Sequence, residues 1–353
     1  MSISRKRGAM MFPKAAKFII LFFAIALVIT GAIAFKLYSD IFSPVVTEDS
    51  TIFIPENSEK DDVFRILDQS GAIAKISAVK WVAKKKKYGN NIYPGNYGLT
   101  KGMNANQLMN MLRAGNQTPI CATFNNCRTA EDLAGKVSKY IQADSLSLLQ
   151  IFSDDVLMNK YGFTKDNFPT MFIPNTYEMY WTTDALGFAD RMHKEYEKFW
   201  NEGRLNKAKD CGLSPIEVEI LASIVQSETA KIDEAPTVAG LYINRLKKNM
   251  KLESDPTVKY AVGDPTIRRV LYEHLEKDSP YNTYKQQGLP PGPICFSEIQ
   301  FIDAVLNYEK HNYLFMCAKE DMSGYHNFAK TSAEHSRNAV KWRRALDERK
   351  IWK

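Results

Sequence analysis

An uncharged apolar run near the N-terminus constrains this chain more than any other feature of its sequence. The run extends from Phe18 to Phe35, contains no proline, and has the length that a helix needs to cross a membrane. No acidic residue precedes it, whereas five basic residues do: Arg5, Lys6, Arg7, Lys14 and Lys17. By the positive-inside rule, this pattern predicts that residues 1–17 are cytoplasmic and that the chain after Lys36 lies outside.

A cleaved signal peptide is the competing interpretation of the same run. The apolar stretch is longer than the core of a typical signal peptide, and no A-x-A cleavage site closes it. We therefore expect an uncleaved transmembrane helix over residues 18–37, in the cell (inner) membrane.

The charge and the metal-binding residue types exclude several classes of function. The formal net charge is +7, of which the basic tail supplies +5, so the remainder of the chain carries only about +2. We find no basic face and no nucleic-acid-binding module, and expect no nucleic-acid partner. The five cysteines and five histidines form no zinc-binding pattern. We expect no metal and no cofactor.

The pattern beyond the membrane segment predicts an α+β protein with two folded parts. Residues 38–50 form a polar connector. Residues 51–119 show a strand at 51–54, a helix capped by Ser58, a helix over 77–87 and a second strand after Tyr93-Pro94-Gly95. This strand–helix–helix–strand order resembles the small LysM carbohydrate-binding module. Residues 120–353 form a larger mixed α/β domain, which we predict to be catalytic.

Two segments of the larger domain have the composition of a substrate groove. Residues 172–181 are rich in aromatic side chains, which either stack on sugar rings or pack into the core. Residues 288–294 form a proline-rich loop that is stiff enough to shape a groove wall. A buried strand is expected at 313–318.

The stretch from Ser214 to Glu228 contains the most informative carboxyl group. Ser214 and Glu217 form a capping box, with Pro215 at the first helical position. On a helical projection Glu228 falls near the middle of an apolar face, whereas Glu219 and Gln226 fall on the opposite, solvent-facing side. A carboxylate in such a place is either paired with a base, here Arg245 or Lys251, or used in chemistry.

The chemistry that fits one buried carboxyl is general acid catalysis. Burial raises the pKa of a carboxyl toward neutrality, and cleavage of a glycosidic bond requires one protonated acid. A hydrolase adds a second carboxylate. Asp255 is a conceivable second group, but capping of the helix that starts at Pro256 explains it equally well.

The motifs around Glu228 resemble the MltG/YceG-like endolytic murein transglycosylases. The resemblance rests on Leu221-Ala222-Ser223-Ile224-Val225 with Ser227-Glu228-Thr229, and on further pieces in the same order. These pieces are Ile243-Asn244-Arg245-Leu246, residues 250–258, Tyr281-Asn282-Thr283-Tyr284, residues 288–294 and His326-Asn327-Phe328. The likeness covers essentially the whole chain.

The resemblance implies a peptidoglycan lyase. It implies cleavage within glycan strands between N-acetylmuramic acid and N-acetylglucosamine, leaving a 1,6-anhydro end without consuming water, and a role in ending nascent strand elongation. Glu228 takes the place of the family's catalytic acid. Many members carry a second glutamate where this chain has Gln226, which cannot be an acid. Cell-wall synthases are implied as partners, beside peptidoglycan and the membrane.

We also predict a set of groove residues around the acid. We predict substrate contacts from Asn244, Arg245, Asp255, Tyr281, Asn282, Tyr284 and His326. Arg245 and Asp255 could instead pair with each other, and Tyr281 and Tyr284 could only pack. Two rival functions remain at this point: a hydrolytic muramidase that uses Asp255 to activate water, and a non-catalytic membrane-anchored scaffold that binds peptidoglycan.

Overall fold

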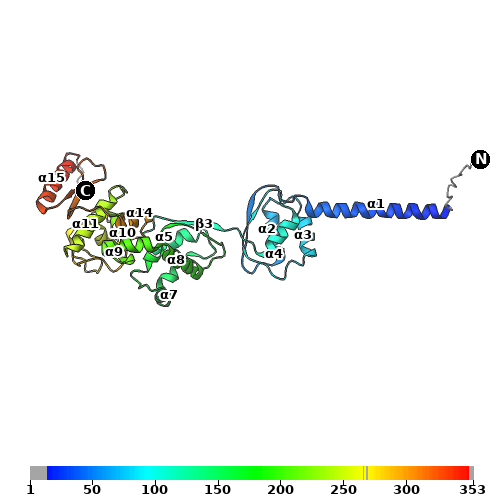
Figure 1. The fold of residues 1–353 in the computed structure, drawn as a ribbon, viewed down its shortest axis with the longest axis horizontal. Helices are drawn as coiled ribbons and strands as arrows, with labels where there is room; N and C mark the ends of the chain where they lie inside the picture. Colours follow the sequence, from blue (N-terminus) through cyan, green and yellow to red (C-terminus); the bar gives the residue numbers. More distant parts are fainter. Residues whose placement is uncertain (1–13, 265, 268, 350–353) are drawn as a thin grey trace, which may run out of the picture. The chain divides into compact units, whose positions relative to one another are not determined.

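The computed structural model describes residues 14–264, 266–267 and 269–349, and its chain divides into two compact units (Figure 1). Unit 1 comprises Met1–Pro119 and unit 2 comprises Ile120–Lys353. The predicted mixed α+β architecture is confirmed, with three separate two-stranded antiparallel sheets in the described part of the chain. Arg5, Lys6 and Arg7 of the basic tail lie outside the described residues.

Unit 1 starts with the apolar segment and continues with the elements predicted for residues 51–119. Its elements are α1 (Lys14–Phe42), β1 (Ser50–Ile54), α2 (Lys60–Gln69), α3 (Ile76–Lys85), β2 (Gly95–Leu99) and α4 (Ala105–Ala114).

Helix α1 contains the 19-residue apolar window Phe18–Lys36, none of which is buried. Phe18 and Leu27 are 72% and 74% exposed. In water such a surface is unfavourable, because each large apolar side chain loses about 1.5–3 kcal/mol by remaining hydrated. Near the end of the helix, Ile41 packs on the core of unit 1.

The rest of unit 1 is a small sheet covered by helices. Strands β1 and β2 pair antiparallel with Ile52 opposite Tyr97, and Ile52, Ile54 and Tyr97 point into a core completed by α2, α3 and α4. The predicted cap of α2 was wrong by one residue. Glu59 is the N-cap, while the Ser58 hydroxyl donates to the Pro55 carbonyl.

Unit 2 contains the remaining elements. These are β3 (Ile120–Phe124), α5 (Ala130–Val137), α6 (Ser145–Gln150), the 3-10 turn η1 (Ile151–Ser153), α7 (Asp155–Lys160), the 3-10 turn η2 (Phe168–Met171), β4 (Asn175–Met179), α8 (Ala185–Phe199), α9 (Glu202–Cys211), α10 (Pro215–Glu228), α11 (Ala235–Lys247), α12 (Asp255–Val262), α13 (Tyr272–Leu275), α14 (Ile299–Leu306), β5 (Phe315–Ala318), β6 (His326–Ala329) and α15 (Ser332–Glu348).

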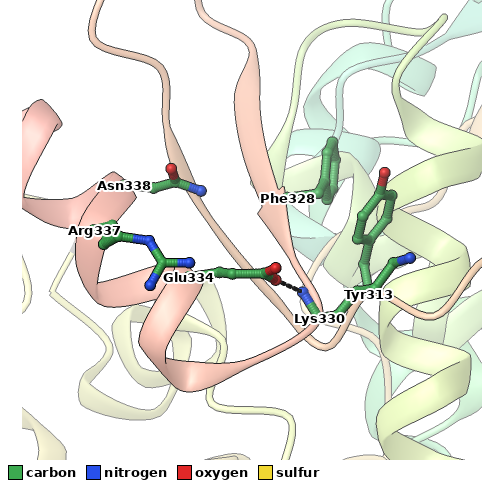
Figure 2. Close-up of a pocket in the computed structure, with 6 residues that line it drawn as sticks. All are labelled: Tyr313, Phe328, Lys330, Glu334, Arg337 and Asn338. Atoms are coloured by element: carbon green, nitrogen blue, oxygen red, sulfur yellow. Dashed lines mark hydrogen bonds between the residues drawn. The ribbon is translucent and has the colours of Figure 1, made fainter.

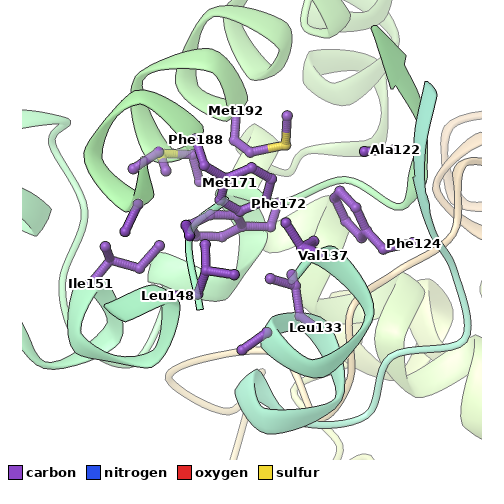
Figure 3. Close-up of a cluster of buried hydrophobic side chains, with 14 of the residues drawn as sticks. Ala122, Phe124, Leu133, Val137, Leu148, Ile151, Met171, Phe172, Phe188 and Met192 are labelled. Carbon is purple, nitrogen blue, oxygen red and sulfur yellow. The ribbon is translucent and has the colours of Figure 1, made fainter. Parts of the chain in front are cut away.

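The first core of unit 2 lies between the β3–β4 pair and helices α5, α6 and α8 (Figure 3). Phe172 and Phe188 are in its centre, with stacked rings whose centroids are 5.9 Å apart. Phe172 and Tyr177 are buried, so the core interpretation of the aromatic segment 172–181 holds for both. Among the aromatic residues of the segment, Tyr180 is exposed to solvent.

The second core surrounds α10, which packs against α9, α11, α12 and α14. Every residue from Val218 to Val225 is buried, so the helix has no solvent face along this stretch. The prediction that Glu219 faces solvent was therefore wrong. Glu219 is 2% exposed, and its carboxylate accepts a hydrogen bond from the Trp200 indole N–H at 3.0 Å.

The segment after the proline-rich loop lies along α10. The amide of Ile294 donates to the Ser223 hydroxyl at 3.0 Å, and the Ser297 hydroxyl donates to the Glu219 carbonyl at 2.8 Å. Gly292 fits where a Cβ atom would lie 1.9 Å from the Asp166 carbonyl oxygen, so only glycine allows this approach.

The C-terminal part of unit 2 is the β5–β6 hairpin with α15 against it. The prediction of a buried strand at 313–318 was only half right. Residues Phe315–Ala318 do form a strand, but all four are partly exposed. The capping box of Thr331 and Glu334 starts α15 as predicted.

Candidate active site

Glu228 is the last residue of α10 and stands where three further segments converge. The helix begins with the predicted Ser214–Glu217 capping box and runs through the second core of unit 2, so its end is fixed in space. The side chain of Glu228 is half-buried, and it keeps contact with solvent at the mouth of this core. Buried scaffold and partial access together suit a group that meets a substrate.

Two hydroxyl groups hold one oxygen of the Glu228 carboxyl. Tyr242, on α11, donates to Oε1 at 2.6 Å, and Ser254, immediately before α12, donates to the same atom. No group in the described part of the chain donates to Oε2. Tyr242 and Ser254 are both buried, so the carboxyl has one fixed oxygen and one unpartnered oxygen.

The surroundings of Glu228 raise the pKa of its carboxyl above the usual value. Burial is the main cause, and the nearby charge of Asp255 adds to it. The hydrogen bonds from Ser254 and Tyr242, and the proximity of His326, act in the opposite direction but do not cancel the burial. The C-terminal end of α10 also disfavours a negative charge, because the helix dipole is negative there.

The residue after Glu228 starts a second polar network. The Thr229 hydroxyl donates to Glu234 Oε2 at 3.1 Å, and His326 Nδ1 lies 2.8 Å from the same oxygen. The backbone N–H of His326 donates to Glu234 Oε1 at 2.7 Å. Buried Glu234 therefore binds strand β6 to the end of α10 and fixes the imidazole of His326 beside Glu228.

A third set of polar contacts at this site joins Asp255 and Tyr284. The Tyr284 hydroxyl donates to Asp255 Oδ1 at 2.7 Å, and the charge of Glu228 is among the causes that raise the pKa of Tyr284, after burial and the bond to Asp255. The expected capping role of Asp255 was wrong. Ser254 is the N-cap of α12, and Asp255 is its first residue, with an exposed side chain.

Neither of the bases considered as structural partners of Glu228 forms an ion pair with it in the part of the chain that the structure describes. Arg245 forms an ion pair with Glu253, and its Nε and Nη1 donate to the carbonyls of Lys251 and Leu314, each at 2.8 Å. Lys251 forms no ion pair among the described residues. Both structural alternatives, Glu228 with a base and Arg245 with Asp255, were therefore wrong.

The remaining predicted groove residues fall into two groups. Asn244 and Asn282 bind backbone carbonyls within the protein: Asn244 holds those of His311 and Tyr313, and Asn282 holds those of Leu275 and Lys277. Tyr281 is half-buried beside Tyr260, with its hydroxyl 3.4 Å from Asp166 Oδ1. The structure thus gathers Asp255, Tyr284 and His326 around Glu228, and it uses Asn244, Arg245 and Asn282 to fix loops.

Sequence reasoning missed the groups that touch Glu228 directly. Tyr242 is fourteen positions along the chain from Glu228, and Ser254 twenty-six, so no local pattern links them to the acid. The sequence gives one indication for Ser254, because a serine before Asp-Pro is typical of a helix N-cap. In the structure its side chain makes no capping hydrogen bond and contacts Glu228 instead.

Fold and site together define a class of proteins. Its members have an apolar N-terminal helix, a small α+β unit and a larger unit built around a helix that ends in one carboxyl, which here forms no ion pair with a base among the described residues. The sequence profile of the YceG-like family matches residues 52–341. The chain belongs to the YceG-like family.

Relatives with assigned names are similar over most of the chain. An endolytic murein transglycosylase of Bacillus subtilis is 27% identical over 344 residues, which cover 92% of this chain and 93% of the relative. A protein of the same name from Streptococcus pneumoniae is 26% identical over 322 residues, which cover 82% of this chain and 58% of that longer protein. The crystal structure of a YceG-like protein from Listeria monocytogenes is 28% identical, with a TM-score of 0.54 over 82% of this chain and 98% of that one.

Proposed function

We propose that this protein is an endolytic murein transglycosylase in which Glu228 is both proton donor and proton acceptor. The activity is supported by the names of the relatives that match most of the chain. The role of Glu228 is supported by one observation: it is a half-buried carboxyl with a raised pKa that, within the described part of the chain, has one oxygen without a hydrogen-bond donor and no basic partner.

Glu228 is protonated at the start of the proposed reaction and is protonated again at its end. The carboxyl gives its proton to the glycosidic oxygen between N-acetylmuramic acid and N-acetylglucosamine, and the bond from that oxygen to muramoyl C1 breaks. The muramoyl C6 hydroxyl bonds to C1 and loses its proton to the Glu228 carboxylate. The products are an anhydro end and a free hydroxyl, and no water is consumed. Because the nucleophile belongs to the substrate, one carboxyl suffices.

The hydrolytic alternative requires Asp255 to activate water. Asp255 is exposed and accepts a hydrogen bond from Tyr284, and it lies close enough to Glu228 to raise its pKa. In a hydrolase Asp255 would be the base that activates water. The lyase reaction requires of Asp255 only a negative charge, which helps keep Glu228 protonated.

Digestion of murein sacculi, followed by mass analysis of the products, separates these functions. The lyase predicts 1,6-anhydro ends from the wild type, none from E228Q, and anhydro ends from D255N at a reduced rate. E219Q is the matched control. It changes a second buried carboxyl on α10, about 13 Å from Glu228 toward the start of the helix. Reducing ends from the wild type would indicate a hydrolase, and equal effects of wild type and E228Q would indicate a scaffold.

We further propose that α1 is an uncleaved membrane anchor with its N-terminus in the cytoplasm. The exposed apolar window Phe18–Lys36 and the basic residues before it support this orientation. Protein purified from membranes should retain peptides from the apolar segment. Recovery of a mature chain that starts beyond Lys36 would instead identify a signal peptide.

Unit 1 supplies a candidate contact for glycan outside the active site. A hollow of about 800 Å³ lies between residues 56–61 and 88–94. Asn57, Ser58 and Asn90 are among the residues that line it. Their amide and hydroxyl groups are of the kind that hydrogen-bond sugar hydroxyls, which supports the carbohydrate-binding role predicted for residues 51–119.

A further inference from the structure

A pocket of about 310 Å³ lies between the β5–β6 hairpin and α15, and neither the fold nor the proposed reaction accounts for it (Figure 2). One wall is aromatic. The rings of Tyr313 and Phe328 stack 5.5 Å apart with 28° between their planes, and each ring packs on the second core of unit 2 with one side left partly exposed. This wall offers a ligand a small apolar contact surface.

The facing wall is polar and has an excess of positive charge. Arg337 and Asn338 project from the first turns of α15, and Lys330 stands just before that helix. Neither Lys330 nor Arg337 forms an ion pair in the described part of the chain. The one acid, Glu334, is already committed, because its carboxylate accepts hydrogen bonds from the backbone amides of Lys330 and Thr331.

Strand β6 connects this pocket to the candidate active site. His326 and Phe328 are two positions apart on the strand, so their side chains point to the same face, about 7 Å from each other along it. His326 is bound to Glu234, which also binds Thr229, the neighbour of Glu228. The pocket therefore begins on the same face of β6 as His326, which lies beside Glu228.

We propose that this pocket binds the peptide stem of the muramoyl residue nearest the cleavage site, through a carboxylate of that stem. The proposal rests on the proposed function, since it takes murein as the substrate. Muramoyl residues carry short peptides with free carboxylates and small methyl side chains. Arg337 can bind a carboxylate through two N–H groups, and the methyl groups can lie on Phe328 and Tyr313. The volume is at the low end for ligand pockets, so it suits a dipeptide-sized group rather than a disaccharide.

The test compares two substrates that differ only in their stems. Purified full-length protein in detergent is given murein strands with intact stems, and strands from which an amidase has removed the stems. We expect R337A to lower kcat/KM on stem-bearing strands by roughly tenfold, the usual size for loss of a charged hydrogen bond, and to leave stem-free strands unchanged. Arg344, exposed on the same helix outside the pocket, gives the matched control R344A.

Each outcome bears on one proposal only. Equal kcat/KM values for R337A and wild type on stem-bearing strands would overturn the stem site. An equal loss on both substrates would also overturn it, because it would place Arg337 in sugar binding. Absence of anhydro products from the wild type on either substrate would refute the proposed function instead. In that case binding of a soluble stem peptide to the wild type and to R337A still tests the pocket directly.

Discussion

At the scale of single residues, the distinguishing feature is a carboxyl that folding makes harder to ionise. Burial raises the pKa of Glu228 in the folded protein above its unfolded value. Between those two values the folded state binds more protons than the unfolded state, so stability decreases as pH rises through that window. The ionisation of Glu228 therefore destabilises the fold at neutral pH.

The first prediction follows from this decrease in stability as pH rises. E228Q should be more stable to urea than the wild type at neutral pH, because it removes an ionisation that opposes folding. The advantage should shrink as pH falls below about 4, where the wild-type carboxyl becomes protonated in both states. Free energies of unfolding at several pH values measure this. The exposed Glu348 supplies the control, since E348Q should change the free energy by less than about 0.5 kcal/mol. Constant destabilisation of E228Q at all pH values would contradict the account.

The second prediction concerns the two hydroxyl donors. Each hydrogen bond to Oε1 lowers the pKa of Glu228, so Y242F and S254A should each raise it further. The alkaline limit of kcat/KM, where the acid loses its proton, should therefore move to higher pH in both variants. The pH profile is the measurement, and it is independent of any change in maximal rate. A shift to lower pH would show that these hydroxyls stabilise the protonated form.

The residue scale also shows what the sequence alone can and cannot predict. The capping boxes at Ser214 and Thr331 were predictable, because their partners lie three residues away. The burial of Glu219 was not, because a helical projection assumes one solvent face, and α10 has none over Val218–Val225. The hydroxyls on Oε1 depend on tertiary contacts that no local spacing records.

At the scale of elements, helix α11 holds the segment before β5 by close approach. The Asn244 side chain binds the carbonyls of His311 and Tyr313, and the amide of Glu309 donates to the Pro236 carbonyl at 3.0 Å. Gly240 faces the same segment, where a Cβ atom would lie 2.3 Å from the Glu309 carbonyl oxygen. This packing explains why a helix interior tolerates a glycine here.

The third prediction compares two glycines in helices. G240A should destabilise the protein by about 1–3 kcal/mol, because the added methyl group must push the backbone of Glu309 away. Gly135 in α5 has no atom within 4 Å of an added Cβ, so G135A should stabilise the protein by about 0.5–1 kcal/mol. Thermal or urea unfolding of both variants measures the difference. Equal effects at the two positions would show that helix propensity, rather than close packing, governs Gly240.

At the scale of the whole molecule, the five cysteines differ in how far they are exposed to solvent. All five cysteines are free: Cys121 is exposed, Cys317 is partly exposed, and Cys127, Cys211 and Cys295 are buried. Burial raises the pKa of the Cys295 thiol to about 11, which keeps it protonated and unreactive. Cys121, at the start of unit 2, is thus the natural reporter of where that unit lies.

The fourth prediction uses Cys121 to test the orientation of the chain. In a C317S background, a membrane-impermeant maleimide should label Cys121 in right-side-out vesicles and fail to do so in sealed inverted vesicles. The expected result follows from the basic residues that precede α1. C121S is the control for labelling at the buried thiols. Labelling only in inverted vesicles would place unit 2 in the cytoplasm.

The unequal oxygens of Glu228 have a consequence for the order of events in the proposed reaction. Because Oε1 already accepts from Tyr242 and Ser254, the carboxyl proton belongs on Oε2. A carboxyl with two equivalent oxygens could release a proton from one and recapture another proton with the second. In the proposed reaction, release and recapture would both take place at Oε2. The muramoyl sugar would therefore have to bring its bridging oxygen and its C6 hydroxyl to Oε2 one after the other.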